Sequence, residues 1–581
     1  MPMRRDQYYR SVRERTPLLR RITEEPGALL RGSISSALEG LRHDEEAPLS
    51  KARGGFIVAS IGLLIFLQGT VFFNLPSTTL TTNISVLTTT QSAIAADLDA
   101  FDKVTWLTSS YLIAMSSLAP LMGRLSQVFS ARLCMFISTV IIAAGTLVVA
   151  TANTFETFIV GRVITGTGAS GIFIVASIIT IQMTSPERRG LFIGLMNTGM
   201  TAGMSLGAVI AGALEPKIGW KPLFGVQAPL CLVAGIGLLL SIPTNYTSKG
   251  NTYVQYSLKQ KLARIDYSGA ILLVATIVLF LFGLSGPRIL QEPLILSAFA
   301  LPLFVLNEIY IAKDPVIPVT VMRSRGTLLT CLAAVGSMMA RWAVLFYTPV
   351  YAIAVRNWAP AAAGSILIPT NAGFAAGGII AGVFHIKREG SFYVHSVIAM
   401  ALWPFTMVAL ALVSTPTSSW ALYMLLVFLN GLITGAALNY TLVHLLHLTL
   451  PEVHPIIISV LATFRGFAGS FGSAIGGGLF GRVLHRSLVD GFADAGLEHR
   501  GDLVRRLLGS PALVGKLEGI EQTVAVGAYQ DAIKALFFAA TGLAVVVTFV
   551  QACTGWKSPV PKAEQEPEEV ITGEEGVIGG T

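Results

Sequence analysis

The feature that most constrains this chain is a recurring run of about 20 apolar residues, the length that crosses the hydrocarbon core of a bilayer as one helix. About fourteen such windows occur along the sequence. Only 13% of the 581 residues are charged, against about 25% in a typical soluble protein. The sequence therefore predicts an all-α polytopic membrane protein. The windows lie near residues 56–75, 104–121, 133–152, 158–182, 190–214, 220–242, 267–284, 294–312, 327–351, 360–384, 393–412, 420–449, 455–484 and 531–551.

The basic residues between these windows alternate from loop to loop. Loops on the side of the N-terminal tail hold roughly thirteen Lys and Arg residues, and the intervening loops hold roughly five. Cytosolic loops retain basic residues, so both termini are expected in the cytosol. The net charge of +8 comes largely from these loops and the tail, which argues against a nucleic-acid partner.

Both ends of the chain are polar. Residues 1–53 are Arg-rich and lack the apolar core of a signal peptide, so they are expected to form a disordered cytosolic tail. This tail contains Glu14-Arg-Thr-Pro-Leu18-Leu19, which has the form of an acidic dileucine sorting signal. A receptor reads such a signal as an address, so a sorting adaptor is a candidate partner. Residues 557–581 are expected to form a second disordered cytosolic tail.

The first window does not end cleanly. It continues past Pro76 through Thr-rich sequence to about Leu98, too long for one crossing of a core ~30 Å thick. Either the helix breaks at Pro76 or the stretch around residues 69–81 is extra.

A long non-cytosolic loop is expected at Leu488–Gln530. Apolar residues in it recur at helical spacing between charged ones: Leu503, Val504, Leu507 and Leu508. The pattern predicts an amphipathic helix that lies on the membrane surface or caps the helix ends.

The fifth window carries glycines at intervals that place them along one seam: Gly194, Gly203, Gly207 and Gly212. In lipid, helices associate where small residues let their backbones approach closely. The seam therefore predicts a tightly packed helix, with or without a role in transport.

Several motifs together resemble the major facilitator superfamily, in its fourteen-span branch of fungal drug:proton antiporters. The glycine seam falls on the register of that family's antiporter motif, although Ala208 stands where the motif has Pro and Ala211 where it has Gly. Gln127 likewise stands where the family has Asp. The Thr-Pro-Leu-Leu sequence of the tail makes the vacuolar basic amino acid transporters the nearest subgroup. The other matching segments are Asp102–Leu112, Gly123–Arg132, Gly161–Gly168, Pro186–Gly190 and Phe464–Gly472.

The resemblance runs from about Phe56 to Gln551 and implies the major facilitator fold. That fold has two six-helix bundles, here residues 54–242 and 313–556, the second including the non-cytosolic loop 485–530. A cytosolic linker at 243–266 and two extra helices at 267–312 are expected between them. Gly123 and Arg132 would belong to a conformational motif between the second and third spans. The bundles are expected to rock about a site near the bilayer midplane, in a monomer.

Three arginines lie inside apolar windows, where a charge requires a partner or a task. Arg162 is expected to contact substrate or a proton-carrying acid, or else to bond backbone carbonyls or Glu156. Arg341 has no acid within a helical turn, so its partner must come from another helix or from an anionic substrate. Arg465 contacts substrate or locks its span to neighbouring helices.

Acids are missing where a proton antiporter needs one. Asn83 stands where the family's first helix often carries Asp, and the fourth span ends in Gln182 rather than an acid. Asp97, Asp99 and Asp102 look peripheral. Proton coupling is thus implied by the resemblance alone. The proton gradient is the expected energy source, and neither a cofactor nor a metal is expected.

Aromatic and amide side chains inside the windows are candidates to line a pocket for an amphiphilic ligand. They are Trp106, Tyr111, Tyr347, Asn371, Asn430, Asn439 and Tyr440. The alternative is that many of them serve packing or the interfacial aromatic belts.

The leading functional hypothesis is an antiporter that moves amino acids or amphiphilic organic compounds out of the cytosol. If the dileucine signal operates, the destination is the vacuole. The alternatives are a plasma-membrane efflux pump for drugs or secondary metabolites, and a transporter-like receptor that no longer cycles. An enzyme is not expected, because no Walker loop, metal-ligand cluster or nucleophile–base motif occurs.

Overall fold

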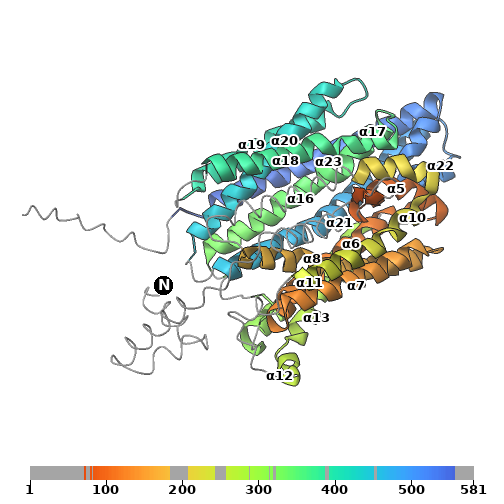
Figure 1. Cartoon of the computed structure of the whole chain (residues 1–581). Coiled ribbons are helices and arrows are strands. Elements are labelled where there is room, and N and C mark those ends of the chain that lie inside the picture. The colour runs from red at the N-terminus through yellow and green to blue at the C-terminus, as the bar shows by residue number, and fades with distance from the viewer. Residues whose placement is uncertain are drawn as a thin grey trace, which may run out of the picture. The chain divides into compact units, whose positions relative to one another are not determined.

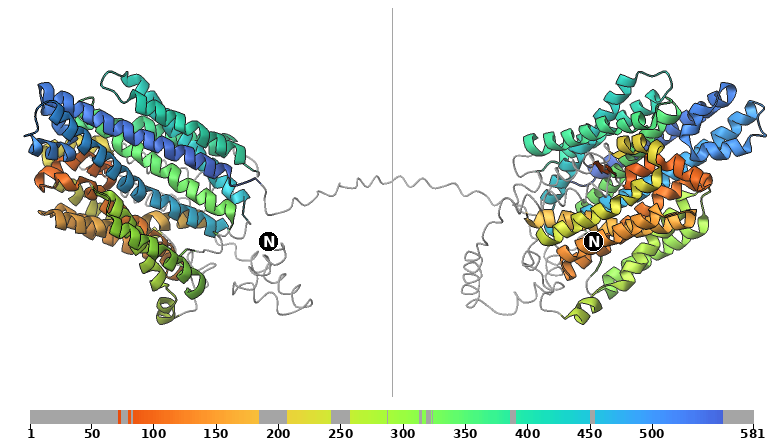
Figure 2. Two further views of the ribbon diagram at one scale, coloured as in Figure 1. Left: turned by 180° about the vertical axis from the view of Figure 1, so that it is seen from behind. Right: turned by 45° about the vertical axis from the view of Figure 1, so that its right-hand side comes forward.

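The computed structural model describes residues 71–73, 79–81, 83–183, 207–241, 257–286, 288–312, 315–317, 322, 324–385, 391–449 and 454–556. Long helices running side by side make up nearly all of this part of the chain (Figures 1 and 2). The predicted all-α fold class is confirmed. Apart from the helices, the described residues contain one pair of three-residue strands.

Helices from the first half of the chain pack into one group, called here the first group. Its long members are α6 (Val104–Val128), α7 (Ala131–Ala150), α8 (Phe155–Met183) and α11 (Gln227–Ser241). Helix α7 begins after Ser130, whose side chain accepts a hydrogen bond from the Leu133 N–H at 3.2 Å and so satisfies an orphan donor. Helices α7 and α8 approach so closely at Gly168 that a Cβ there would lie 2.6 Å from the Ser138 carbonyl oxygen. Small residues thus set the helix spacing.

Two shorter helical segments follow α8 in the described residues. One comprises residues 207–218, and the other is α10 (Trp220–Gly225). The Trp220 ring packs edge-on against Phe158 of α8, with ring centroids 5.7 Å apart.

Helices from the second half form a second group around α16 and α21. Its long members are α16 (Arg325–Ala354), α18 (Leu367–Ile379), α19 (Tyr393–Val413), α20 (Trp420–His447), α21 (His454–Asp494) and α23 (Gly519–Ala552). Helix α18 is preceded by the short α17 (Pro360–Ser365) and followed by a π-helical turn, η5 (Ile380–His385). Proline at the first position of α17 suits a helix start, where its missing N–H leaves no bond unmade.

A helix pair lies between these groups in sequence: α13 (Tyr267–Ser285) and α14 (Gln291–Leu306), which ends in the π-helical turn η4 (Asn307–Ile311). Helix α13 packs on α6 of the first group and on α21 of the second. The short α12 (Leu258–Ala263) comes before it. Asp266 caps α13 by accepting the Gly269 N–H at 2.8 Å. The buried Glu308 accepts the Val316 N–H at 3.2 Å and so fixes the chain after η4.

Eight helices in the described residues are long and apolar enough to cross a membrane, and each overlaps a predicted window. They are 131–150, 267–285, 291–311, 325–354, 360–382, 393–413, 420–447 and 519–552. The total of fourteen spans stays a prediction.

The first predicted window is wrong at its end. Residues Val71–Phe73 form strand β1, which pairs antiparallel with β2 (Thr79–Thr81), and helix α5 (Asn83–Asp97) follows. β-Branched and aromatic residues favour strands, and a proline such as Pro76 disfavours helix at the residue before it. Residues 57–70 lie outside the described part of the chain.

Other windows differ in their ends. The window at 220–242 comprises two helices, α10 and α11, which meet at Val226, and the window at 360–384 is divided at Ile366. Helix α21 continues to Asp494, and α23 begins at Gly519. Less of the loop at Leu488–Gln530 is therefore non-helical than the sequence predicts.

Candidate functional site

A cavity of about 340 Å³ lies where the first and second groups meet, at the end of the helices where α6 begins. Its walls come from α6, α16 and α21, and α22 (Gly501–Gly509) lies against it. Aromatic rings from both groups line it: Phe101, Trp106, Phe346, Tyr347, Phe480 and Tyr529. A volume of this size accommodates a small organic molecule.

Two residues that the sequence predicts for a ligand pocket line this one cavity. Trp106 comes from α6 and packs on Phe282 of α13, with ring centroids 5.2 Å apart. Tyr347 comes from α16 and packs on Phe480 of α21 at 4.6 Å. The cavity therefore has one fixed ring from each group, although the two residues are far apart in the sequence.

Helix α22 is the amphipathic helix predicted in the long loop. Val504 and Leu507 are buried on its inner face, whereas Asp502 and Arg506 form an exposed ion pair of 2.9 Å. The Tyr529 hydroxyl donates to the Leu507 carbonyl, and Gly509 is so close that a Cβ there would lie 2.7 Å from the Phe101 Cα. Helix α22 thus packs on the helix ends and closes one side of the cavity.

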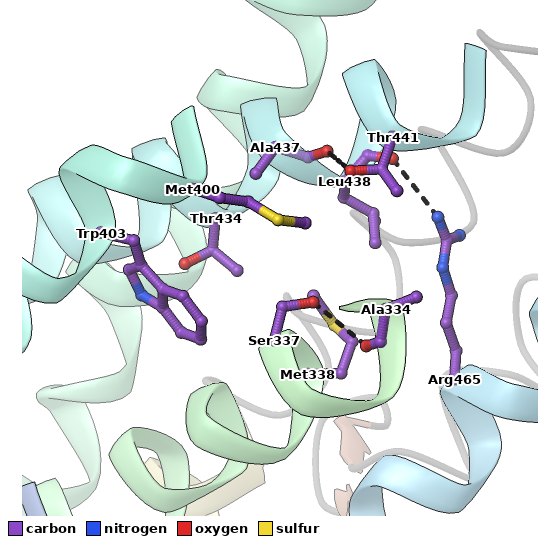
Figure 3. A pocket seen from close by; sticks show the side chains of 10 residues that line it. All are labelled: Ala334, Ser337, Met338, Met400, Trp403, Thr434, Ala437, Leu438, Thr441 and Arg465. Carbon is purple, nitrogen blue, oxygen red and sulfur yellow. Dashed lines mark hydrogen bonds between the residues drawn. The ribbon is translucent and has the colours of Figure 1, made fainter. Parts of the chain in front are cut away.

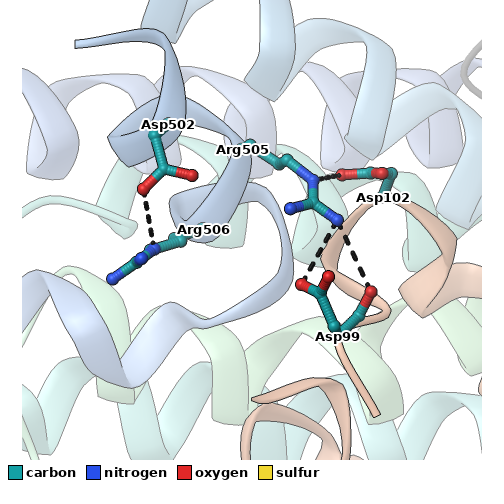
Figure 4. A network of polar contacts seen from close by, with 5 residues as sticks. All are labelled: Asp99, Asp102, Asp502, Arg505 and Arg506. Carbon is teal, nitrogen blue, oxygen red and sulfur yellow. Dashed lines mark hydrogen bonds and ion pairs between the residues drawn. The ribbon is translucent and has the colours of Figure 1, made fainter.

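An ion pair links α22 to the residues just before α6, where a short 3-10 turn, η1 (Phe101–Lys103), leads into that helix (Figure 4). The Arg505 Nε donates to Asp102 Oδ1 at 2.6 Å, and its Nη2 lies 3.3 Å from Asp99 Oδ1. The hydrogen bond to Asp102 and the negative charge of that carboxylate raise the pKa of Arg505 above the ordinary value of an arginine. Asp102 therefore lines the cavity as a paired residue, and its half-exposed side chain at the helix end agrees with its predicted peripheral position. The partners are 403 residues apart, so no local pattern reveals the pair.

Arg162 is fully buried in the first group. Its Nε donates to the Leu107 carbonyl at 3.2 Å, and its guanidinium carbon lies 4.4 Å from the centre of the Tyr111 ring. The predicted bond to a backbone carbonyl is present. Stacking on the ring stabilises the cation where water is excluded, so Arg162 and Tyr111 form one unit between α6 and α8.

Arg341 obtains its partner from another helix, one of the two sources that the sequence leaves open. Its Nη2 donates to Asn371 Oδ1 of α18 at 2.9 Å, and its guanidinium lies 4.0 Å from the centre of the Phe374 ring. Arg341 is only 4% exposed. The structure thus brings together Arg341 and Asn371, two predicted site residues, inside the second group.

Arg465 lies beside a second, much smaller pocket within the second group (Figure 3). Its Nη2 donates to the Leu438 carbonyl of α20 at 3.3 Å. The pocket volume of about 10 Å³ has room for about one water molecule, too little for an organic ligand. This geometry favours the locking role over substrate contact.

The remaining amides bond to neighbouring helices. Asn439 donates to the Gly378 carbonyl at 2.7 Å, and Asn430 donates to the Thr406 hydroxyl at 2.9 Å. The Tyr440 hydroxyl lies 2.7 Å from the His385 Nδ1. These bonds are interhelical contacts away from the cavity lining.

The described end of the glycine seam packs against α17. A Cβ at Gly212 would lie 2.7 Å from the Ala361 backbone nitrogen, and a Cβ at Gly364 would lie 2.8 Å from the Ala208 carbonyl carbon. This contact joins the first group to the second at the α17 end. Gly207 is buried, and Gly194 and Gly203 lie outside the described residues.

Other predicted site residues occupy helix ends or lie outside the described part. Gly123 is buried in α6, and Arg132 is the second residue of α7. Asn83 begins α5, and Gln182 lies in the last turn of α8. The sorting-signal residues Glu14, Leu18 and Leu19 lie outside the described residues.

Two groups of apolar helices that enclose a cavity between them define a multi-pass membrane protein of the transporter class. Residues 57–473 match the sequence profile of the Major Facilitator Superfamily, and the chain belongs to that family.

Fungal members of the family are the relatives most informative about function. The chain is 25% identical to the MFS transporter L2 of a Phoma species over 76% of its length and 73% of the relative. It is 25% identical to the MFS-type efflux pump LUC4 of a Fusarium species, over 76% of both chains. It is 28% identical to the MFS thioclapurine efflux transporter tcpA of Claviceps purpurea, over 60% of this chain and 64% of the relative.

A solved structure shares the fold. A bacterial homologue of the human lysosomal transporter Spinster, in an inward-facing and unoccupied conformation, superposes with a TM-score of 0.56. The alignment covers 88% of this chain and all of that chain at 13% identity. At this identity the likeness concerns architecture only.

Proposed function

We propose that this protein is a proton-driven antiporter that exports amphiphilic organic compounds from the cytosol and binds them in the cavity beneath α22. The observation that carries the proposal is that both helix groups contribute aromatic walls to one cavity. When the two helix groups move relative to one another, the cavity walls that they contribute must separate. In alternating access, such a separation opens the site and releases the ligand. The fungal relatives with efflux in their names support export as the direction.

Proton coupling in this proposal rests on the resemblance to drug:proton antiporters. The energy source would be the proton gradient, with no cofactor. The working unit would be a monomer, with the lipid bilayer and the small-molecule substrate as its partners. Amino acids are a second substrate class, which the resemblance of the tail to vacuolar basic amino acid transporters favours.

Transport by the full chain in proteoliposomes tests the proposal. With an imposed pH gradient we expect a fluorescent amphiphile to move faster than without one. Trp106→Ala should lower this flux about tenfold, because it removes a ring that packs one wall of the cavity. A matched control is Phe538→Ala, which removes an aromatic side chain that is 46% exposed on α23.

The outcomes separate an antiporter, a uniporter and a receptor. Gradient-dependent flux that Trp106→Ala reduces and Phe538→Ala preserves supports the antiporter. Flux that ignores the pH gradient would indicate a uniporter. Absence of flux for amphiphiles and amino acids alike would favour a receptor that no longer cycles.

The destination membrane is proposed to be the vacuolar one, because of the acidic dileucine sequence at Glu14–Leu19. Replacing Leu18 and Leu19 with alanine should move a tagged protein to the cell surface, which microscopy would record. The control replaces Leu38 and Leu41 of the same tail with alanine. Unchanged localisation of the Leu18 and Leu19 variant would remove the vacuolar proposal and leave the plasma membrane.

A further inference from the structure

We infer that the cavity beneath α22 selects uncharged, ring-bearing molecules over organic cations, and that Arg505 sets this selectivity by neutralising Asp102. The inference rests on the proposed function, because it names the substrate class of the same cavity. It goes further in assigning a specificity-determining residue to α22, outside the apolar helices.

The uncharged part of the lining suits a neutral amphiphile. The aromatic rings of the lining offer flat apolar faces on which a ring of the ligand can stack. The amide and hydroxyl groups of the lining can bond a neutral polar substituent, and a few such groups in an apolar cavity normally orient a ligand. These polar lining residues are Gln91, Thr105, Thr108, Ser285 and Ser473.

Rings alone would also attract a cation through their π faces, so the charges of the lining decide the selectivity. Besides the exposed His485, the ionisable acids and bases of the lining are Asp102 and Arg505, which are bonded at 2.6 Å. Their charges cancel. A cation that enters the cavity loses its hydration shell and meets no unpaired carboxylate in return. Binding of a cation is therefore unfavourable.

Nearby charges leave this balance unchanged. Asp502, whose charge also acts on Arg505, is exposed and pairs with Arg506 at 2.9 Å. Asp99 also pairs with Arg505, but its side chain is 75% exposed and does not line the cavity. Arg482 donates to the carbonyls of Leu284 and Gly286 at 3.3 and 3.2 Å, at the carboxyl end of α13. The negative end of the helix dipole therefore compensates this cation.

Arg505→Gln tests the inference, because it removes the cation and leaves Asp102 as an unpaired carboxylate in the lining. The probes are the dansyl amides of ethanolamine, which is neutral, and of aminoethyl-trimethylammonium, which is a permanent cation. Binding of each to the purified full-length protein is followed by dansyl fluorescence. Binding is measured rather than flux, so that proton coupling does not enter the result.

The wild-type protein should bind the neutral probe about tenfold more tightly than the cation, and Arg505→Gln should shift this ratio about tenfold toward the cation. A larger shift is not expected, because the Asp102 side chain is 53% exposed and water screens part of its charge. Asp102→Asn should weaken binding of the cation further, because Arg505 then lies in the lining without that partner.

The double variant Arg505→Gln/Asp102→Asn separates charge from displacement of α22. It lacks the ion pair, as Arg505→Gln does, but carries no free carboxylate, so we expect the wild-type preference to return. The matched control is Arg500→Gln at the beginning of α22, where Arg500 pairs with Glu521 at 2.9 Å away from the lining. It should leave the ratio unchanged.

Three results would overturn the inference while the proposed function stands: equal wild-type affinity for both probes, an unchanged ratio in Arg505→Gln, or an altered ratio that persists in the double variant. If neither probe binds to folded wild-type protein, the cavity is not a ligand site. The proposed function then fails at its central observation, and the inference fails with it.

Discussion

Gly377→Val is expected to prevent the protein from accumulating in a folded form. Helices α18 and α20 touch backbone to backbone, and a Cβ at Gly377 would overlap the Leu432 carbonyl oxygen. Gly373 faces the Phe428 carbonyl in the same way, and Gly431 and Gly435 on α20 face carbonyls of α18. A branched side chain must push the two helices apart, which destabilises by about 4 kcal/mol or more. Thermal unfolding and size-exclusion profiles of detergent-solubilised protein would measure the loss.

The matched control for this change is Gly542→Val. Gly542 lies in the long helix α23, and nothing is within 4 Å of a Cβ built there. The same side chain should therefore be tolerated. Equal melting temperatures for Gly377→Val and the wild-type protein would show that α18 and α20 are not in this close contact.

Arg341→Met is the second change with a large expected effect. It removes a buried cation that bonds Asn371 and lies over the Phe374 ring, and it leaves the Asn371 side chain without that donor. Losing one partner of a buried charged hydrogen bond costs about 2–5 kcal/mol. We expect a lower melting temperature and loss of gradient-driven flux in proteoliposomes.

A second substitution separates a structural role for Arg341 from a role in transport. In Arg341→Met/Asn371→Leu both polar groups are replaced by apolar ones, which often restores stability at a buried site. We expect the melting temperature to recover while flux stays low, because the buried cation between α16 and α18 is still missing. Recovery of flux together with stability would instead assign Arg341 to packing alone.

The helices themselves could be predicted from the sequence with few errors. The windows that became α7, α13, α16, α19 and α20 each coincide with a helix within a few residues at either end. Local hydropathy suffices there because every backbone group in lipid must be bonded within its own helix. It failed near Val71–Thr81, where β-branched and aromatic residues form paired strands inside an otherwise apolar stretch.

The candidate site could be predicted only in part. The sequence predicts Trp106 and Tyr347 as pocket residues because aromatic side chains can line an apolar cavity, and both line this one. Arg505 falls within the predicted amphipathic segment and Asp102 among the acids predicted to be peripheral, but no sequence pattern connects the two residues. Their pairing depends on where a loop between α21 and α23 folds back, and neither residue's neighbours in sequence carry that information.

The sequence by itself determined that this chain is helical, that it belongs in a membrane, and which residues are polar within its apolar windows, because these follow from the cost of exposing backbone and charge to lipid. The tertiary structure alone decided which of those residues meet. It placed Arg341 against Asn371, Arg465 beside a pocket too small for a ligand, and Arg505 against Asp102 in the cavity lining. These contacts join residues that are far apart in the sequence. They depend on how whole helix surfaces pack against one another, which no local sequence pattern specifies.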